Sequence, residues 1–387
     1  MGRPESSVAH VLLAPDKFKG SLSARDVASA LASGMRRTGP GLSTDLCPVA
    51  DGGDGTLEAA LSAGFRRVPA EVEGPTGQRV TAAYAERDGV ALVELAQAAG
   101  LSRLPGNHPA PLTASTYGVG QLAAAAIAAG NRTVVLAAGG SASSDGGAGL
   151  VQALGAELSG RTGEPLRRGG GALTGIARID LRRMHERIGG VAFVLASDVT
   201  NPLLGRHGAA AVFGPQKGAS PGDVAALERG LARWADAVAQ ATGVDAASRP
   251  GAGAAGGTGF GALALLGASV IGGADMVLEM VHFADRVRRA SLVVTGEGTL
   301  DEQTRYGKAP ARVAQAAHAA GVPTVAVAGR CTIGQDDLHA LGIRRVYALQ
   351  ALEPDPAKSI ANAAPLLERI GEQIAAGEPG GEWRPWT

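Results

Sequence analysis

Short runs of apolar, β-branched residues alternate along this chain with longer stretches rich in alanine and leucine. The run 10–14 (HVLLA) predicts a buried strand, and 23–35 has helical spacing, with Ser23 as its N-cap and Asp26 three residues on. A second strand over 44–49 and a second helix over 56–63 follow. Strands and helices in this order are typical of a parallel sheet with right-handed crossovers.

The same pattern returns near the other end of the sequence. Strands are expected over 291–295, 323–328 and 345–349, and helices over 309–320 and 362–375. The middle of the sequence, in contrast, predicts a sheet that is not purely parallel. The runs 67–73 and 79–85 are joined by Gly-Pro-Thr-Gly as in a hairpin, and 90–95 is expected to continue that sheet. Further strands are expected over 133–138 and 191–196, and loops over 160–175 and 245–257.

These patterns predict an α/β protein with two domains. Both ends of the chain, residues 1–66 and 288–387, are expected to form a parallel-sheet domain. A mixed-sheet α/β domain, residues 67–287, is expected to be inserted between them. A cleft between two such domains is a common place for a ligand.

Composition excludes several classes of function. The 387 residues carry 36 bases and 36 acids with no basic stripe, and aromatic residues are only 3%, which argues against a nucleic-acid partner. Two distant cysteines exclude a disulfide framework. The longest Ala/Leu stretch, 122–129, is too short to span a bilayer, and the start lacks an apolar signal region. We expect a cytoplasmic, reduced protein that binds no membrane.

Lysine is rare and its placement is uneven. Only five of the 36 basic residues are lysines: Lys17, Lys19, Lys217, Lys308 and Lys358. Four of them stand in glycine-bearing polar loops. A lysine is a compact charge on a flexible stem and suits a phosphate or carboxylate oxygen. Codon usage and chance would also give this pattern, but an anion site assembled from separate loops is the interpretation that the other motifs favour.

Six polar loops concentrate acids, hydroxyls and glycines, and most of them follow an expected strand. They are 16–21, 51–56, 139–149, 197–205, 214–218 and 295–308. Ligands of open α/β sheets bind beyond the carboxyl ends of the strands. The loop 139–149 (GGSASSDGGAG) precedes an expected helix over 150–154 and resembles a phosphate cradle, although a tight turn would look the same. Its candidate phosphate-binding residues are Gly140, Ser141, Ser143, Asp145 and Gly146, to which Lys217 of another loop is added.

Other motifs are weak or missing. Gly251–Gly256 matches G-x-G-x-x-G, but the polar residues before it do not form a strand, so a close helix approach is favoured over a nicotinamide site. The Walker and protein-kinase signatures are absent. Acids in the loops, together with lysines, suit Mg²⁺ bound to a polyphosphate. These acids are Asp51, Asp54, Asp145, Asp198, Glu297 and Asp301.

Taken together, the motifs resemble the bacterial class I glycerate kinase family. The segments that carry the resemblance are 14–21 (APDKFKGS), 48–56 (PVADGGDGT), 139–149, 197–205 (SDVTNPLLG), 214–219 (GPQKGA), 295–304 (TGEGTLDEQT) and Gly307-Lys308. They occur in order from about residue 10 to residue 370. The family loop usually has Thr-Asn where this chain has Ser143-Ser144, which puts a role for the Ser144 side chain in doubt.

The resemblance implies a Rossmann-like, three-layer domain and ATP-dependent phosphorylation of D-glycerate, usually on the 2-hydroxyl. Lys17 or Lys19 would then hold the γ-phosphate, Asp51 or Asp198 would accept the hydroxyl proton, and Arg330 or Lys308 would bind the substrate carboxylate. Glu297 and Asp301 are the candidates for Mg²⁺, and Ser21 and Asp54 are added as substrate-binding candidates. The implied partners are ATP and D-glycerate, and a homo-oligomer is left open.

Three alternatives stay open at this point. The first is phosphorylation of the 3-hydroxyl, which gives 3-phosphoglycerate. The second is a non-catalytic protein of the same fold that binds a small acid. The third is a nicotinamide-dependent hydroxyacid dehydrogenase that uses Gly251–Gly256, for which the preceding strand is not expected.

Overall fold

The computed structural model describes residues 9–39, 41–302, 304 and 307–377. The terminal residues 1–8 and 378–387 and three residues of the candidate loop 295–308 (Gln303, Arg305 and Tyr306) lie outside the described residues. The chain forms two compact units. The first contains the residues up to Asp51 and from Ala274 onward, and the second contains Gly52–Gly273. None of the described helices combines the length and apolar character needed to cross a membrane.

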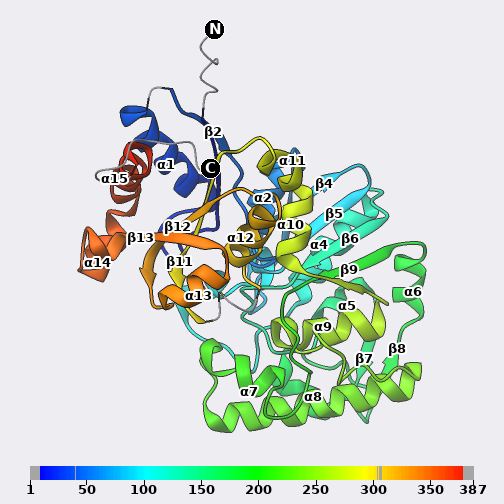
Figure 1. Cartoon of the computed structure of the whole chain (residues 1–387). Coiled ribbons are helices and arrows are strands. Elements are labelled where there is room, and N and C mark those ends of the chain that lie inside the picture. Colours follow the sequence, from blue (N-terminus) through cyan, green and yellow to red (C-terminus); the bar gives the residue numbers. More distant parts are fainter. Residues whose placement is uncertain (1–8, 40, 303, 305–306, 378–387) are drawn as a thin grey trace, which may run out of the picture. The chain divides into compact units, whose positions relative to one another are not determined.

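The first unit is built on a five-stranded parallel sheet in the order β13-β12-β11-β1-β2 (Figure 1). Its strands are β1 (His10–Pro15), β2 (Ser43–Leu46), β11 (Leu292–Leu300), β12 (Thr324–Cys331) and β13 (Ile343–Ala348). Strand β1 comes from the start of the sequence and lies between β2 and β11. In its pairing with β11, Val11 lies opposite Leu292. The predicted parallel sheet made from both ends of the chain is therefore confirmed.

Helices cover both faces of this sheet, as a buried parallel sheet requires. They are α1 (Ala24–Thr38), α10 (Gly273–Met280), α11 (Phe283–Val287), α12 (Ala309–Ala319), α13 (Gln335–Ala340), α14 (Pro356–Ala361) and α15 (Ala363–Ala376). Val325 and Val327 pack with α1 and α15, whereas Ala326 and Ala328 pack with α12 and α13. The alternation along β12 thus produces the expected three layers. Ser23 caps α1 by accepting the N–H of Asp26, as predicted.

Strand β11 is longer than the sequence suggested. It was expected to stop at Thr295, but its pairing with β12 continues through Glu297↔Ala328 to Leu300↔Cys331. Gly296 permits this, because a methyl group there would lie 2.1 Å from the carbonyl oxygen of Val327. As a result Glu297 belongs to a strand and Asp301 follows it directly.

The second unit contains a six-stranded mixed sheet in the order β10-β9-β6-β5-β4-β3. Its strands are β3 (Arg66–Glu73), β4 (Arg79–Arg87), β5 (Val90–Glu94), β6 (Thr133–Ala137), β9 (Ala192–Ala196) and β10 (Ser269–Ile271). The β3–β4 and β4–β5 pairs are antiparallel and the rest are parallel, so the expected hairpin and mixed sheet are confirmed. A separate two-stranded sheet joins β7 (Glu157–Ser159) to β8 (Arg178–Asp180).

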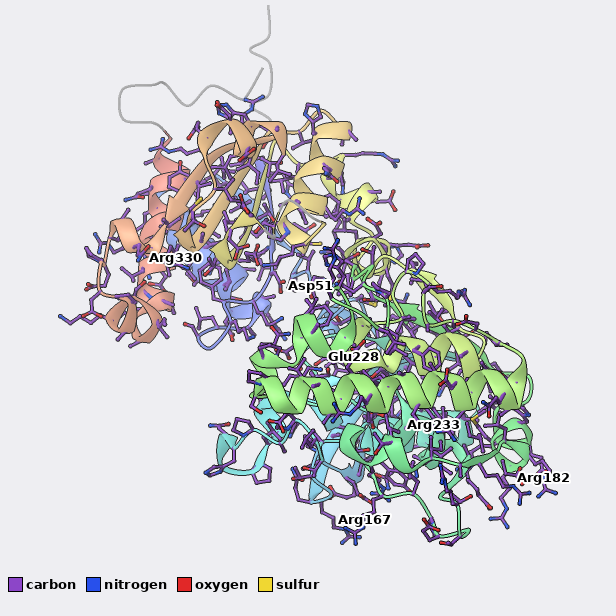
Figure 2. All side chains as sticks on the ribbon, turned by 90° about the horizontal axis from the view of Figure 1, so that it is seen from below. Asp51, Arg167, Arg182, Glu228, Arg233 and Arg330 are labelled. Atoms are coloured by element: carbon purple, nitrogen blue, oxygen red, sulfur yellow. The ribbon has the colours of Figure 1, made fainter. Side chains whose placement is uncertain are left out.

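The helices of this unit surround one hydrophobic core that includes Trp234 and Phe260. They are α2 (Thr56–Ser62), α3 (Ala96–Ala99), α4 (Tyr117–Ala128), α5 (Ala148–Leu154), α6 (Arg182–Ile188), α7 (Ala209–Phe213), α8 (Pro221–Thr242) and α9 (Ala254–Leu265). The long helix α8 carries Glu228 and Arg233 (Figure 2). Two expected loops contain short helical turns. A 3₁₀ helix spans Gly170–Gly175, and α9 starts within the segment 245–257.

The boundaries between the units differ from the expected positions at 66/67 and 287/288. Helix α2 belongs to the inserted unit, where the carboxylate of Glu94 accepts the N–H groups of Gly55 and Leu57 at 3.1 and 2.8 Å. Helix α11 belongs to the first unit, where Arg286 donates to the carbonyl oxygen of Leu46 at 3.1 Å. Both contacts join segments that are distant in sequence, which a reading of local patterns does not detect.

Candidate active site

The predicted site residues fall into two groups, one in each unit. The first unit contains Lys17, Lys19, Ser21, Asp51, Glu297, Asp301, Lys308 and Arg330. The second unit contains Asp54, Gly140, Ser141, Ser143, Asp145, Gly146, Asp198 and Lys217. The first group consists mainly of acids and cations, whereas the second combines a glycine- and serine-rich loop with Lys217 and three aspartates.

Acidic side chains gather at the carboxyl ends of the central strands of the first unit. Asp16 directly follows β1, is 6% exposed, and accepts the backbone N–H of Lys17 at 2.6 Å. Burial raises the pKa of Asp16 to about 8; the charge of Lys17 opposes this shift, and the carboxylates of Asp51 and Glu297 add to it. Asp16 was not among the predicted residues, although its place after a strand and before a lysine was a usable signal.

Glu297 is held by a network that the sequence did not reveal. The hydroxyl of Thr304, a fully buried residue, donates to Oε1 of Glu297 at 2.6 Å, and Lys308 Nζ donates to Oε2 at 3.3 Å. Lys308 also lies 3.8 Å from Oδ1 of Asp301. Burial raises the pKa of Glu297, while Lys308 and Thr304 oppose that shift. Lys308, a candidate for binding a substrate carboxylate, thus lies beside two acids of its own unit.

The remaining cations of this unit differ in exposure. Lys19 is exposed and Lys17 is half-buried, on either side of the buried Phe18. Arg330 is exposed and lies within β12 opposite Thr299, whereas it was expected to follow the strand (Figure 2). Ser21 donates its hydroxyl proton to the carbonyl oxygen of Ile360 at 2.9 Å, so this proton is engaged within the unit.

In the second unit, glycines let the predicted loops approach one another closely. A methyl group at Gly139 would lie 2.4 Å from Cα of Gly53, and one at Gly52 would lie 2.4 Å from Cα of Gly273. Asp198 Oδ1 accepts the N–H of Gly273 at 3.0 Å. The loops after β6 and β9 therefore meet the segment 52–55, as expected for loops at the carboxyl ends of neighbouring parallel strands.

Asp145 is a buried structural acid in this arrangement. Its carboxylate accepts the backbone N–H groups of Thr116, Gly147 and Gly149 at 2.8, 3.2 and 3.2 Å. It also accepts the hydroxyls of Ser115 and Thr116. Since the N–H groups of Gly147 and Gly149 at the start of α5 are already bonded to Asp145, they are not available as the phosphate cradle that the sequence suggested. The carboxylate instead fixes the loop 139–149 against α4.

Lys217 and Ser143 are also less accessible than predicted. Lys217 is 3% exposed, and its Nζ donates to Ser141 Oγ at 2.9 Å and to the carbonyl oxygen of Ser143 at 2.5 Å. Burial lowers the pKa of Lys217 to about 7, and the negative charge of Asp145 opposes this shift. The hydroxyls of Ser143 and Ser144 are buried and have no hydrogen-bond partner among the described residues. A direct phosphate contact by the Ser143 hydroxyl therefore finds no support in this geometry.

The glycine run 251–256 has no dinucleotide context. Turns, not a strand, precede it, and Ala255, Gly256 and Gly257 all have left-handed backbone angles. A methyl group at Gly256 would lie 2.0 Å from the carbonyl oxygen of Ser143. The run therefore serves a close backbone approach, as favoured from the sequence.

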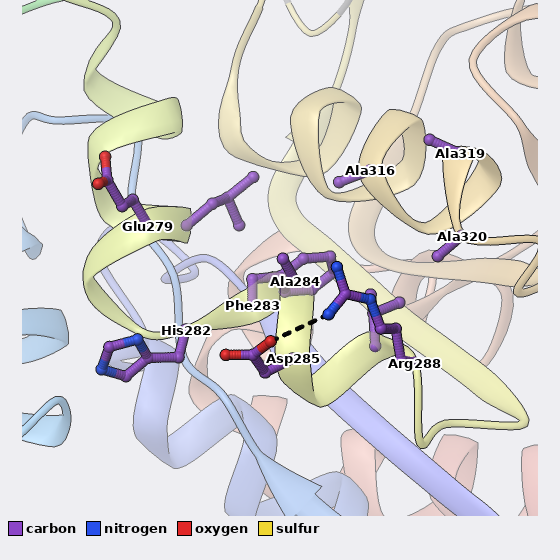
Figure 3. A pocket seen from close by; sticks show the side chains of 11 residues that line it. Glu279, His282, Phe283, Ala284, Asp285, Arg288, Ala316, Ala319 and Ala320 are labelled. Carbon is purple, nitrogen blue, oxygen red and sulfur yellow. Dashed lines mark hydrogen bonds and ion pairs between the residues drawn. The ribbon is translucent and has the colours of Figure 1, made fainter.

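One pocket of about 550 Å³ lies away from these residues (Figure 3). It is lined by α10, α11 and α12, with an exposed ion pair between Asp285 and Arg288 at its side. Ala320 and Arg288 in its wall precede β12 and β11, so the pocket lies at the edge where the strands begin. The candidate acids and lysines of this unit lie at the opposite edge.

Comparison with known proteins gives concordant matches over most of the chain. Residues 11–377 match the family model described as the glycerate kinase family. The chain is 42% identical to a glycerate kinase of Halalkalibacterium halodurans, over 94% of this chain and 97% of the relative. It is 39% identical to the glycerate 2-kinase of Escherichia coli K12, over 88% and 90% of the two chains. A crystal structure described as a candidate glycerate kinase 2 of Salmonella typhimurium LT2 superposes with a TM-score of 0.80 at 38% identity, over 96% of this chain and 98% of that one.

Proposed function

The chain belongs to the glycerate kinase family, and from this premise we propose that it transfers the terminal phosphoryl group of ATP to the 2-hydroxyl of D-glycerate. The products are 2-phosphoglycerate and ADP. The observation that carries the proposal is the 39% identity to a glycerate 2-kinase over 88% of this chain. The loops described above supply the lysines and carboxylates that such a reaction needs.

Phosphoryl transfer depends on positioning the reactants and neutralising charge on the transferred group. The substrate oxygen forms a bond to the γ-phosphorus while the bond from that phosphorus to the bridging oxygen of ADP breaks. We assign Lys17 and Lys19 to the γ-phosphate, because they flank the acid cluster at the carboxyl end of β1. Asp198 or Asp51 accepts the hydroxyl proton, and the exposed Arg330 binds the substrate carboxylate.

Mg²⁺ is the metal that the reaction implies. Among the described residues no three His, Cys, Asp or Glu side chains come together as a metal-binding group. The available donors are nevertheless hard carboxylate oxygens, and Mg²⁺ commonly takes one or two of these together with phosphate oxygens and waters. Glu297 and Asp301 would hold it in the first unit, where it would neutralise phosphate charge. Each oxygen of Glu297 accepts one hydrogen bond from Thr304 or Lys308, and each keeps a further lone pair for a metal.

A single incubation distinguishes this function from its rivals. The protein is mixed with ATP, Mg²⁺ and D-glycerate, ADP is followed by a coupled assay, and the product is identified by phosphorus NMR. We expect 2-phosphoglycerate, and omission of glycerate serves as the control for simple ATP hydrolysis. Formation of 3-phosphoglycerate would assign the other hydroxyl. Calorimetric binding of glycerate without ADP formation would instead indicate a non-catalytic binding protein.

A further inference from the structure

The amine of Lys217 is the buried basic group of the second unit's candidate site, since this residue is only 3% exposed. Its Nζ is directed at two oxygens of the loop 139–149: the hydroxyl of Ser141 at 2.9 Å and the carbonyl of Ser143 at 2.5 Å. A buried amine is tolerated only where acceptors replace water. Lys217 therefore stabilises the conformation of this loop through Ser141 and Ser143. Asp145 stabilises the same loop through its hydrogen bond from the N–H of Thr116, at the start of α4.

The glycine run that lacked a dinucleotide role encloses this amine. A methyl group at Gly256 would lie 2.8 Å from Nζ of Lys217, and the carbonyl oxygen of Gly256 accepts the N–H of Gly146 at 3.1 Å. The left-handed backbone of residues 255–257 makes this approach possible. The run thus keeps Lys217 against the serine loop and excludes water from the contact.

Ser141 differs from the other serines of its loop. It accepts a hydrogen bond from Lys217, and within the described residues its side chain makes no donation of its own. It is 5% exposed and follows the exposed Gly140, whereas Ser143 and Ser144 are fully buried. A hydroxyl that accepts from a lysine amine becomes a stronger donor through its own hydrogen. Its remaining proton needs an acceptor, and an anionic oxygen is the strongest one.

We propose that Ser141 donates its hydroxyl proton to an anionic oxygen of a substrate, and that Lys217 is a positioning residue that acts through Ser141. This inference rests on the proposed function and deepens it. The anionic oxygen belongs to either a phosphate of the nucleotide or the carboxylate of glycerate. Both present the same chemistry to a hydroxyl donor, and the experiment below separates them.

The test compares S141A, K217M, the double variant S141A/K217M and K217R with the wild type. For each protein, KM and kcat are measured for ATP and for glycerate, and binding of ADP and of glycerate is measured by calorimetry. We expect S141A to weaken binding of one of the two ligands about tenfold, the effect of one charge-assisted hydrogen bond, and to leave the other unchanged. The affected ligand identifies the anion.

The relation between the two residues gives a second criterion. K217M should weaken the same ligand by a similar factor, the double variant should be no worse than K217M, and K217R should recover part of the loss. S144A is the matched control, because it removes a hydroxyl of the same loop that has no partner among the described residues. Its constants should equal those of the wild type.

Several results would overturn the inference. Unchanged ligand binding in S141A would remove Ser141 from the site, and losses that multiply in the double variant would show that Lys217 acts independently. If K217M does not fold, S141A and K217R still decide. If the wild type forms no phosphoglycerate, the proposed function fails, whereas calorimetry on S141A still tests the anion contact.

Discussion

Thr304 connects the two acids proposed to bind Mg²⁺: its hydroxyl donates to Oε1 of Glu297 at 2.6 Å and accepts the backbone N–H of Asp301 at 3.2 Å. The N–H of Thr304 in turn donates to the carbonyl oxygen of Asp301 at 2.9 Å. One buried hydroxyl therefore sets both the orientation of a carboxylate and the turn that follows β11.

Replacement of this hydroxyl should disturb metal use. We expect T304V to raise the Mg²⁺ concentration for half-maximal rate severalfold, because the isosteric valine leaves Glu297 with one donor fewer. Initial rates over a Mg²⁺ titration at fixed ATP measure this. T304S keeps the hydroxyl and is the matched control. An unchanged Mg²⁺ dependence in T304V would separate Thr304 from the metal.

Lys17→Ala and Lys19→Ala should each lower kcat about a hundredfold, or about 3 kcal/mol of transition-state stabilisation. Both residues follow a strand in a polar loop, so unfolding in urea should change little. Lys358→Ala, at an exposed position on α14, is the control and should match the wild type. Turnover near the wild-type value in both loop variants would exclude these lysines from the mechanism.

Asp198→Asn should fold and lose nearly all activity. The amide oxygen can still accept the N–H of Gly273, but the side chain can neither take a proton nor bind a metal as a carboxylate does. Steady-state rates at ordinary and raised Mg²⁺ distinguish the two roles, because recovery at raised Mg²⁺ indicates a metal ligand. Asp245→Asn, an exposed position in the same unit, is the control. Full activity of Asp198→Asn at ordinary Mg²⁺ would contradict both roles.

Lys217 should make stability depend on pH. Its pKa is about 7 in the folded protein against 10.5 for an ordinary lysine. Between these values the unfolded chain binds more protons, so the free energy of unfolding should rise as pH increases from about 7 to 10.5. Urea unfolding across this range should show a smaller rise in K217M than in the wild type. Lys358→Ala should keep the wild-type dependence; an equal rise in K217M would place the shift elsewhere.

Features that depend on neighbours in sequence could be predicted. The cap at Ser23 follows from a serine with an aspartate three residues on, and strands such as β1 follow from short apolar runs between polar loops. The placement of the loops after β6 and β9 at the same edge of the sheet follows from the parallel pairing of these strands.

Features that depend on residues distant in sequence could not be predicted from local patterns. The oxygens that Lys217 contacts lie 76 and 74 residues away in sequence, so a lysine in a glycine-bearing loop looked exposed when it is buried. Asp145 looked available to a ligand, but donors from Ser115 and Thr116 occupy it. Glu297 looked like a loop acid because the pairing that extends β11 is with another strand. Burial and hydrogen-bond satisfaction are tertiary properties, which local patterns do not encode.

The pairing of β1 with β11 has a consequence for synthesis on the ribosome. Partners such as Ala14 and Thr295 are separated by 281 residues, so β1 lacks this neighbour strand until β11, Leu292–Leu300, has been synthesised. The second unit is continuous in sequence and is free to fold earlier. At about 5–20 residues per second, β1 waits about 15–55 s for this partner, and its edge on the β11 side stays unpaired during that time. A circular permutant that starts at Ala274 and ends at Gly273 would make both units continuous and remove this delay.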